Sequence, residues 1–317
     1  MGIELVVVGS IGLDDVETPF GSAKASLGGS AIYFSMAASY FARVGMVGVV
    51  GDDFPETAPA MLLRRGVDLE GLERRAGNTF RWGGRYGFDL NERETLFTEL
   101  NVFSDFRPEL PSAYRGAPFL FLGNIDPALQ LHVLTQVERP SLIAMDTMNF
   151  WIHGQKGDLR KVLRKVDALL LNDSEARELT NRTNIVSAAR AIAELGPRIV
   201  VIKRGEYGAM LFFEGEFFYA PAFPLEDVRD PTGAGDSFAG GFMGYLAQCG
   251  ELTWDALCRA TVAGSTLASF SVEAFSVERL RSLDTMAIQR RVLAFQKLTH
   301  FTSMDGSLRV APGVVHP

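Results

Sequence analysis

The chain has 317 residues, of which 47% are hydrophobic and 22% are charged, a balance typical of a folded protein with a sizeable core. Its formal net charge of -7, without a cluster of Lys or Arg, argues against a protein that binds nucleic acid by neutralising phosphates. The two cysteines, Cys249 and Cys258, are too few for a disulfide framework and lack the spacing of a zinc site.

The sequence contains no apolar run of the length that spans a membrane, about 18 residues. Met1 leads directly into a strand-like segment, without a basic flank or an apolar run of signal-peptide length. We therefore expect a cytoplasmic protein that has no membrane partner.

Short apolar runs alternate with amphipathic stretches along most of the chain. The runs are rich in branched and aromatic residues and have the length of buried strands. The expected strands lie at residues 3–9, 44–51, 119–123, 142–146, 168–172 and 198–205. The expected helices lie at residues 30–43, 57–65, 127–137, 158–166 and 185–195. This rhythm implies right-handed crossovers, so the sequence predicts a three-layer α/β/α fold around a mainly parallel sheet.

Two segments interrupt this rhythm. Residues 14–28 and 79–103 are broken by glycines and alternate polar with apolar side chains, and the second can form a hairpin with a turn near Asn91. We expect them to form a small β-sheet lid inserted in one domain of residues 1–317. An exposed edge in residues 79–103 would permit a homodimer through the lid. Residues 208–223 are expected to add a meander with a turn at Glu214 and Gly215.

The most specific feature is RDPTGAGDSFAGGF at residues 229–242. Gly233 and Gly235 permit positive φ and expose backbone N–H groups, and a helix that begins near Asp236 adds the positive end of its dipole. A carboxylate here would repel a stored phosphate, but it suits a base that takes a proton from an attacking hydroxyl. The motif thus predicts an anion hole with Asp236 as the base, or, alternatively, a helix start capped by an aspartate. Three later glycines are expected to allow close helix packing: Gly240, Gly241 and Gly244.

This motif resembles the C-terminal signature of the ribokinase-like carbohydrate kinases, the PfkB family. Residues 28–54, with paired glycines, a helix and a strand ending in Gly-Asp, look like that family's N-terminal signature. An NxxE element begins at Asn172 and a KxGxxG element begins at Lys203, so the resemblance runs over nearly the whole chain. It implies a ribokinase-like fold and ATP-dependent phosphorylation of a primary hydroxyl group on a sugar or nucleoside.

The resemblance also assigns site residues. Asp236 would be the catalytic base, and the anion hole would be Gly233, Ala234 and Gly235. Residues near Mg²⁺ and the phosphates, acting through water, would be Asn172 and Glu175. The nucleotide would be bound by Lys203, Gly205, Gly208 and Thr232. The acceptor would be bound by Asp14, at the end of the first strand segment, with Gly28, Gly29 and Ser30.

Some positions depart from the sugar-kinase pattern or leave alternatives open. Gly12 and Ser30 stand where the family commonly has asparagine, which weakens the case for ribose or fructose. The lid aromatics Trp82, Tyr86, Phe88, Phe97 and Phe103 would suit a nucleobase, as in an adenosine-like nucleoside kinase, but they equally suit packing. The lid arginines Arg81, Arg85 and Arg93 could hold an anionic acceptor or be solvated. Asp230 and residues 269–276 lie where some relatives bind a monovalent cation.

Two strand-end residues are weaker site candidates, and the motifs of two other nucleotide-binding sites are absent from the sequence. Asp146 and Asn149 end a strand near the expected cleft, whereas His132 and His153 have no partners at ligand spacing. The chain contains no GxxxxGK[ST] motif, and GSIGLD rather than GxGxxG follows the first strand, which argues against a P-loop and a dinucleotide site. A non-catalytic metabolite-binding protein on the same fold is the rival from another class, although such a protein would have no use for Asp236.

Overall fold

The computed structural model describes residues 2–300, which are built around one nine-stranded sheet in the order β13-β12-β11-β10-β9-β8-β1-β4-β5. Its strands are β1 (Leu5–Val8), β4 (Val44–Val50), β5 (Asp68–Arg74), β8 (Phe119–Leu122), β9 (Leu142–Asp146), β10 (Ala168–Asn172), β11 (Ile199–Lys203), β12 (Ala209–Phe213) and β13 (Glu216–Ala220). All neighbours from β11 to β5 pair in parallel, whereas β12 and β13 are antiparallel. The predicted mainly parallel sheet and the meander after residue 208 are confirmed.

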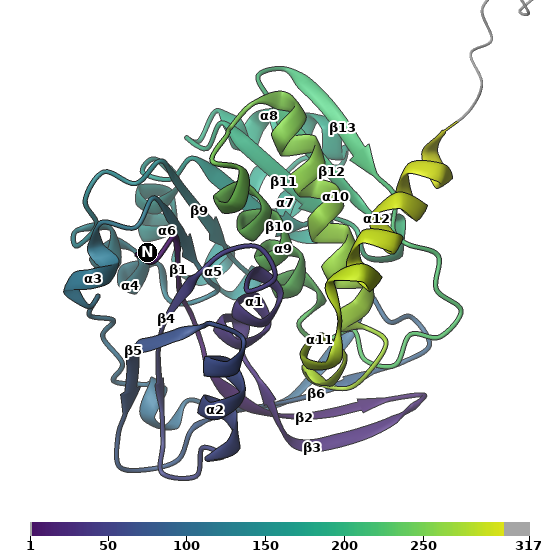
Figure 1. The fold of residues 1–317 in the computed structure, drawn as a ribbon. Helices are drawn as coiled ribbons and strands as arrows, with labels where there is room; N and C mark the ends of the chain where they lie inside the picture. Colours follow the sequence, from purple (N-terminus) through teal and green to yellow (C-terminus); the bar gives the residue numbers. More distant parts are fainter. Residues whose placement is uncertain (1, 301–317) are drawn as a thin grey trace, which may run out of the picture.

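Helices cover both faces of this sheet, as Figure 1 shows. One face packs against α1 (Ser30–Ala38), α2 (Thr57–Arg64), α9 (Ala234–Cys249), α10 (Trp254–Ser271), α11 (Glu278–Ser282) and α12 (Thr285–Thr299). The other packs against α3 (Ser112–Arg115), α4 (Pro127–Leu134), α5 (Asn149–Gly154), α6 (Lys156–Leu163), α7 (Asp173–Thr180) and α8 (Ile185–Ala193). Side chains of β1 alternate between the two cores, Leu5 and Val7 in one, Val6 and Val8 in the other. The three-layer prediction is therefore confirmed.

The structure differs from the predicted elements in a few places. Strand β5 was not predicted, because its sequence DLEGLER has no apolar run and lies half-exposed at the sheet edge. Helix α10 was also not predicted, because its many small residues are buried on several sides and leave no clear amphipathic period. Helix α1 ends at Ala38 rather than residue 43, and a turn leads into β4. None of the helices in residues 2–300 is long and apolar enough to cross a membrane.

The predicted lid is a separate four-stranded sheet in the order β3-β2-β6-β7. Its strands are β2 (Gly12–Thr18), β3 (Gly21–Gly28), β6 (Phe80–Tyr86) and β7 (Arg93–Glu99), and short 3₁₀ turns η1 (Asn101–Phe103) and η2 (Gly205–Tyr207) follow β7 and β11. In Figure 1 the lid strands lie at the bottom, below α11. Strand β1 ends at Val8, so Asp14 lies on lid strand β2 and not at the end of the first strand of the main sheet. The edges of the lid are β3 and β7, and the homodimer through them stays a prediction.

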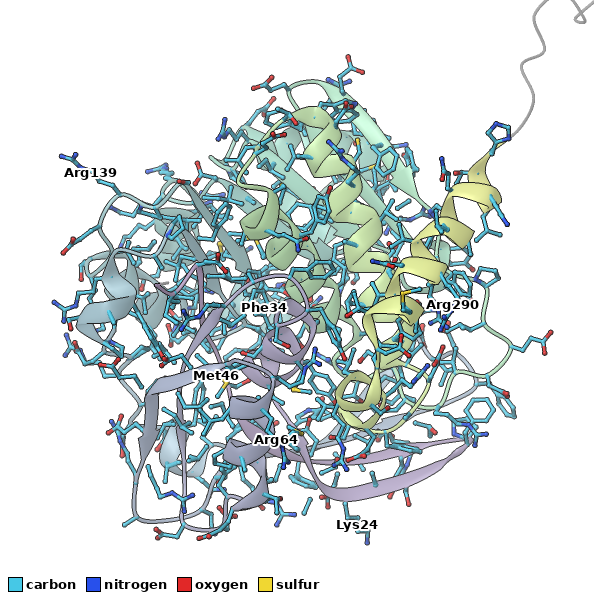
Figure 2. All side chains as sticks on the ribbon, viewed as in Figure 1. Lys24, Phe34, Met46, Arg64, Arg139 and Arg290 are labelled. Atoms are coloured by element: carbon cyan, nitrogen blue, oxygen red, sulfur yellow. The ribbon has the colours of Figure 1, made fainter. Side chains whose placement is uncertain are left out.

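Helix α9 packs between α1 and α10 at distances that only glycine permits. A Cβ at Gly240 would overlap the carbonyl oxygen of Phe34, one at Gly241 would be 2.8 Å from the Ala263 oxygen, and one at Gly244 would be 3.0 Å from the Ala38 Cα. The predicted role of these glycines in helix packing is confirmed. In Figure 2 Phe34 lies within the body of the molecule, whereas Lys24 and Arg139 project at its rim. The close packing sets where the first turn of α9 stands relative to α1.

Candidate active site

The first turn of α9 has the form expected of an anion-binding loop. Gly233 caps the helix with φ 73°, and a Cβ there would overlap the ring of Tyr33, so both backbone and space require glycine. The N–H of Ala234 donates to the Pro231 carbonyl at 3.2 Å. Within residues 2–300 the N–H groups of Gly233 and Gly235 have no hydrogen-bond partner. Two free donors thus stand at the positive end of a 16-residue helix.

Asp236 lies in this first turn and is partly buried. Burial and, second, the charge of Asp146 raise the pKa of its carboxyl, the charges of Lys203 and Arg93 oppose the rise, and the result is a pKa of about 7. A base whose pKa lies near neutral pH combines a usable ionised fraction with a strong tendency to accept a proton. Asp236 is therefore suited to take a proton from a hydroxyl group.

Lys203 is the shared counter-ion of the acidic groups around Asp236. Its Nζ lies 2.9 Å from Oδ2 of Asp146, and the two side chains are only 16% and 8% exposed. Asn172 of β10 lies opposite Lys203 of β11, which brings Glu175 into the same cluster. Burial and, second, the charge of Asp146 raise the pKa of Glu175, the charge of Lys203 opposes the rise, and the result is a pKa of about 7. One lysine therefore faces three carboxyl groups.

Asn172 and Glu175 form a reciprocal capping box at the start of α7. Oδ1 of Asn172 accepts from the N–H of Glu175 at 2.8 Å, and Oε2 of Glu175 accepts from the N–H of Asn172 at 2.8 Å. This pairing orients the buried Glu175 carboxylate at the carboxyl end of the sheet. Among the described residues, no group of three or more His, Cys, Asp and Glu is placed to hold a metal ion. The magnesium role of both residues stays a prediction.

The lid brings Asp14 against the paired glycines. Asp14 is 4% exposed, and a Cβ at Gly28 would overlap its carboxylate. Burial and, second, the charges of Asp230 and Asp236 raise the pKa of Asp14, the N–H of Gly29 opposes the rise, and the result is a pKa of about 7. The charges of Asp14 and Asp236, 222 residues apart in sequence, therefore lie near enough in the fold to affect each other.

Ser30, predicted to contact the acceptor, is bonded to Ser10. The N–H of each serine donates to the other's Oγ at 3.1 Å, and the two Oγ atoms are 3.2 Å apart. This pair ties the start of α1 to the segment after β1. A role of Ser30 in acceptor binding stays a prediction, and Ser10 is a neighbour that the sequence patterns did not single out.

Two of the lid aromatics face the site. Asp14 pairs with Trp82 across β2 and β6, so both side chains project from the same face of the lid. The indole of Trp82 fills the space that Gly84 leaves beside it. The hydroxyl of Thr232 donates to the Tyr86 hydroxyl at 3.2 Å. This bond connects the lid to the segment of residues 232–235 at the start of α9, called the anion loop below.

The other aromatics pack within the lid or face solvent. Phe97 lies against Gly83, on the opposite face from Trp82, and Phe103 packs on Phe80 at 5.6 Å between ring centroids. Phe88 is fully exposed. The packing interpretation therefore suits Phe97 and Phe103, whereas Trp82 projects from the lid face that carries Asp14, and its contact with a nucleobase stays a prediction.

A cavity of about 800 Å³ adjoins the anion loop. Its walls come from the start of α9, the end of β11, α10, residues 222–231 and the lid turn at residues 88–91. The predicted nucleotide residues Lys203, Gly205 and Gly208 line it, together with Ala234 and Gly235. Gly205 has φ 54° and stands against Asn91 of the lid turn, whereas Gly208 has φ 90° and packs against the backbone of residues 220–222. Gly208 is thus required by strand packing as well as by the cavity.

Asp230, singled out for a monovalent cation, is 1% exposed. Its carboxylate accepts from the N–H of Thr232 at 2.8 Å and from the N–H of Ser276 at 3.2 Å. The second of these hydrogen bonds joins Asp230 to the segment of residues 269–276. The cation itself stays a prediction.

The comparisons with known proteins agree with this geometry. A family model described as pfkB family carbohydrate kinase matches residues 143–280. A cytidine kinase of Thermococcus kodakarensis is 30% identical over 250 residues, which cover 77% of this chain and 88% of that protein. This chain belongs to the PfkB family of carbohydrate kinases. It is accordingly a phosphotransferase.

Solved structures of a nucleoside kinase and a ribokinase share the fold. The nucleoside kinase of Methanocaldococcus jannaschii, an archaeal member of the ribokinase family, superposes with a TM-score of 0.73 at 18% identity, over 92% of this chain and 99% of that one. Arabidopsis thaliana ribokinase, complexed with ribose and ATP, superposes with a TM-score of 0.72 at 18% identity, over 92% of this chain and 99% of that one. The ribokinase-like fold is confirmed.

Two features of this PfkB kinase site were weak or absent in the sequence. Asp146 carried only the signal of an acidic residue at a strand end, yet it holds Lys203. Tyr33 carried no signal, because its contact with Gly233 depends on how α1 and α9 cross. Both roles arise from contacts between distant segments.

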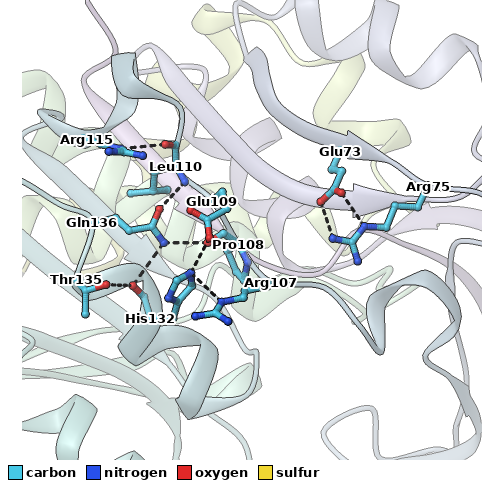
Figure 3. Close-up of polar contacts among 10 residues, drawn as sticks. All are labelled: Glu73, Arg75, Arg107, Pro108, Glu109, Leu110, Arg115, His132, Thr135 and Gln136. Atoms are coloured by element: carbon cyan, nitrogen blue, oxygen red, sulfur yellow. Dashed lines mark hydrogen bonds and ion pairs between the residues drawn. The ribbon is translucent and has the colours of Figure 1, made fainter.

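His132 and His153 lie in structural networks of the kinase. Nε2 of His132 is 3.0 Å from Oε1 of Glu109 and 3.4 Å from Nε of Arg107, and Gln136 bonds the backbone of Pro108 and Leu110 (Figure 3). This network anchors residues 107–110 to α4. His153 similarly pairs with Glu178 at 2.8 Å.

Proposed function

We propose that this PfkB kinase transfers the γ-phosphoryl group of ATP to a primary hydroxyl group of a nucleoside or sugar, with Asp236 as general base. The observation that carries the proposal is the Asp236 carboxyl, with its pKa near 7, beside two free N–H groups at the start of α9. Asp14 faces it from the lid. A base, an anion site and an acceptor carboxylate around one space are the parts that phosphoryl transfer needs.

The proposed reaction is an in-line displacement. The acceptor, held by Asp14, gives its hydroxyl proton to Asp236 while its oxygen forms a bond to Pγ. The bond between Pγ and the β,γ-bridging oxygen breaks, and ADP leaves with that electron pair. The N–H groups of Gly233 and Gly235 hold the equatorial oxygens of the transferred group. Ala234, whose N–H donates to the Pro231 carbonyl, stays a predicted member of the anion hole.

ATP and Mg²⁺ fit the residues around the cavity. A volume of about 800 Å³ is within the range of small-molecule sites, about 300–1,000 Å³. Lys203 and the glycine turn after it would hold the phosphates from one side, and Thr232 from the other. The carboxyls of Asp146, Glu175 and Asp236 carry more negative charge than Lys203 neutralises, which favours a divalent cation near Glu175 and Asn172. Mg²⁺ typically takes one or two carboxylates together with substrate phosphates, and its role would be to neutralise the phosphoryl charge.

A nucleoside is the preferred acceptor. Trp82 shares a lid face with Asp14, so a nucleobase can stack on its indole while the ribose hydroxyls reach the carboxylate. Gly12 and Ser30 lack the amide groups that commonly stand at these positions, and this also favours a nucleoside over a sugar. The similarity to a cytidine kinase supports this choice, and a sugar remains the second candidate.

The test measures ADP production with a panel of nucleosides, sugars and phosphosugars. We expect turnover of at least one nucleoside, and Asp236→Asn should lower kcat by about 10³ or more while the Kd of ATP is nearly unchanged. The matched control is Asp255→Asn, which removes the same charge from the first turn of α10 and should keep full activity. Equal kcat for Asp236→Asn and wild type would refute the base. ATP binding without turnover of any acceptor would favour the non-catalytic alternative.

A further inference from the structure

Arg93 differs from the other two arginines of the lid. Arg85 pairs with Glu17 at 2.8 Å and with Glu94 at 3.6 Å, and Arg81 pairs with Asp15 at 3.3 Å. Among the described residues, Arg93 has no ion-pair partner within 4.0 Å, and its guanidinium lies 5.6 Å from the ring centroid of Trp82. The first two arginines stabilise the lid, whereas the charge of Arg93 is available to a ligand.

The backbone places Arg93 on the face of the lid that covers the site. Arg93, the first residue of β7, pairs with Tyr86, the last residue of β6. Paired residues project to the same face, and the Tyr86 hydroxyl accepts a hydrogen bond from Thr232, directly before Gly233. Arg85 is adjacent to Tyr86 in the strand and projects to the opposite face.

The turn that precedes Arg93 reaches the nucleotide side of the site. Residues 88–91 line the same cavity as Gly205 and Gly235, and Asn91 stands directly against Gly205. The positive charge of Arg93 lowers the pKa of both Asp236 and Glu175, against the larger effect of their burial. Its place directly after this turn, on the covered face of the lid, and the effect of its charge on both carboxyls favour a position of Arg93 on the phosphate side of the site.

We propose that Arg93 binds the γ-phosphate of ATP from the lid, opposite the N–H groups of Gly233 and Gly235. This rests on the proposed function. The site holds several buried carboxyls and one lysine, which is already paired with Asp146. A triphosphate brings more negative charge into it, so a second side-chain cation stabilises the bound nucleotide. Because a guanidinium can donate two parallel hydrogen bonds to phosphate oxygens, Arg suits this role better than Lys.

The test compares the binding of two nucleotides in the presence of Mg²⁺, by calorimetry. The probes are a β,γ-non-hydrolysable ATP analogue and ADP, and the readout is the ratio of their Kd values, which isolates the γ-phosphate. Arg93→Gln should raise the Kd of the ATP analogue by about tenfold or more relative to the Kd of ADP. A change of this size corresponds to the loss of one charge-assisted hydrogen bond. Arg93→Lys should restore part of the loss. Arg85→Gln, which removes an equal charge from the other lid face, should leave the ratio unchanged.

The outcomes separate this inference from the proposed function. An unchanged ratio in folded Arg93→Gln overturns the assignment, and a raised KM for the acceptor in that variant would assign Arg93 to the acceptor. A loss of the same size in Arg85→Gln would also overturn it, because the effect would then be a general one of charge. Failure of the wild type to phosphorylate any acceptor would refute the proposed function while the binding ratio still reports on Arg93. Because Arg93 is exposed and forms no ion pair in residues 2–300, we expect its variants to fold, which thermal unfolding checks.

Discussion

At the scale of single residues, the site is defined by carboxyl groups whose environments raise their pKa values. Asp14 and Asp236 both have pKa values near 7, mainly because burial disfavours their charged forms. Their surroundings differ. Asp236 has Lys203 and Arg93 nearby, whereas Asp14 has the N–H of Gly29 and three like charges, those of Asp230, Asp236 and Asp15. A carboxyl with a counter-ion next to an anion site suits a base, and one in the lid suits a hydrogen-bond acceptor for the substrate.

The raised pKa of Asp236 predicts a pH-dependent rate. The base acts only when deprotonated, so kcat/KM for an unionised acceptor should rise with pH and level off above about 7. Below that midpoint it should fall about tenfold per pH unit. Steady-state rates between about pH 5 and about pH 9 measure this, with a return to neutral pH as the control for irreversible loss. A flat profile over this range would contradict the assignment.

At the scale of elements, the position of the anion loop depends on the packing of α9 against α1 and α10. Gly240 and Gly241 allow backbone contact on two sides of α9, and Gly233 allows the loop to pass over Tyr33. The helix start is therefore held by close contacts further along the same helix. A small change in these contacts moves the donors and Asp236 together.

Filling one of these contacts should destabilise the protein. Gly240→Ala places a Cβ on the Phe34 carbonyl, and overpacking of this kind typically costs about 1–3 kcal/mol. The matched control is Gly157→Ala in α6, where a Cβ meets nothing within 4 Å, so a neutral or slightly stabilising effect is expected. Urea unfolding measures both. Equal stability of Gly240→Ala and wild type would show that α1 and α9 can separate without cost.

At the scale of the whole molecule, the site makes stability depend on pH. The pKa values of Asp14, Glu175 and Asp236 are about 7 in the folded chain, far above their ordinary values of 3.8, 4.5 and 3.8. At pH values between the ordinary pKa values and about 7, the folded state binds more protons than the unfolded state. Stability is therefore highest where the carboxyls are protonated and is lost as the pH rises toward 7. The free energy that preorganises the site thus opposes folding at neutral pH.

Replacement of one carboxyl should flatten this dependence. Asp14→Asn removes a group whose shift is worth up to about 4 kcal/mol, so the variant should lose less unfolding free energy than wild type between about pH 5 and about pH 8. Urea unfolding at the two pH values measures the difference between the slopes. The control is Asp255→Asn at the start of α10, for which we expect the wild-type slope. Parallel slopes for Asp14→Asn and wild type would contradict the raised pKa of Asp14.

Much of the architecture and the central motif could be predicted from local patterns. The apolar runs at β1, β4 and β8 to β11 follow from period and length, and the glycines at 233 and 235 follow from the backbone that an anion loop needs. Such signals lie within a few residues. They predicted the three layers, the lid and the position of Asp236.

Tertiary structure alone decided which charges meet. Asp146 pairs with Lys203 because β9, β10 and β11 are neighbours, and Tyr33 lies under Gly233 because α1 crosses α9. The lid arginines look equivalent in sequence, but strand register pairs Arg85 with Glu17 and leaves Arg93 beside Tyr86 on the covered face. Burial and long-range electrostatics depend on segments far apart in the chain, so no local pattern could reveal them. The sequence by itself determined the fold and the proposed base, and the tertiary structure determined the electrostatic environment in which that base lies.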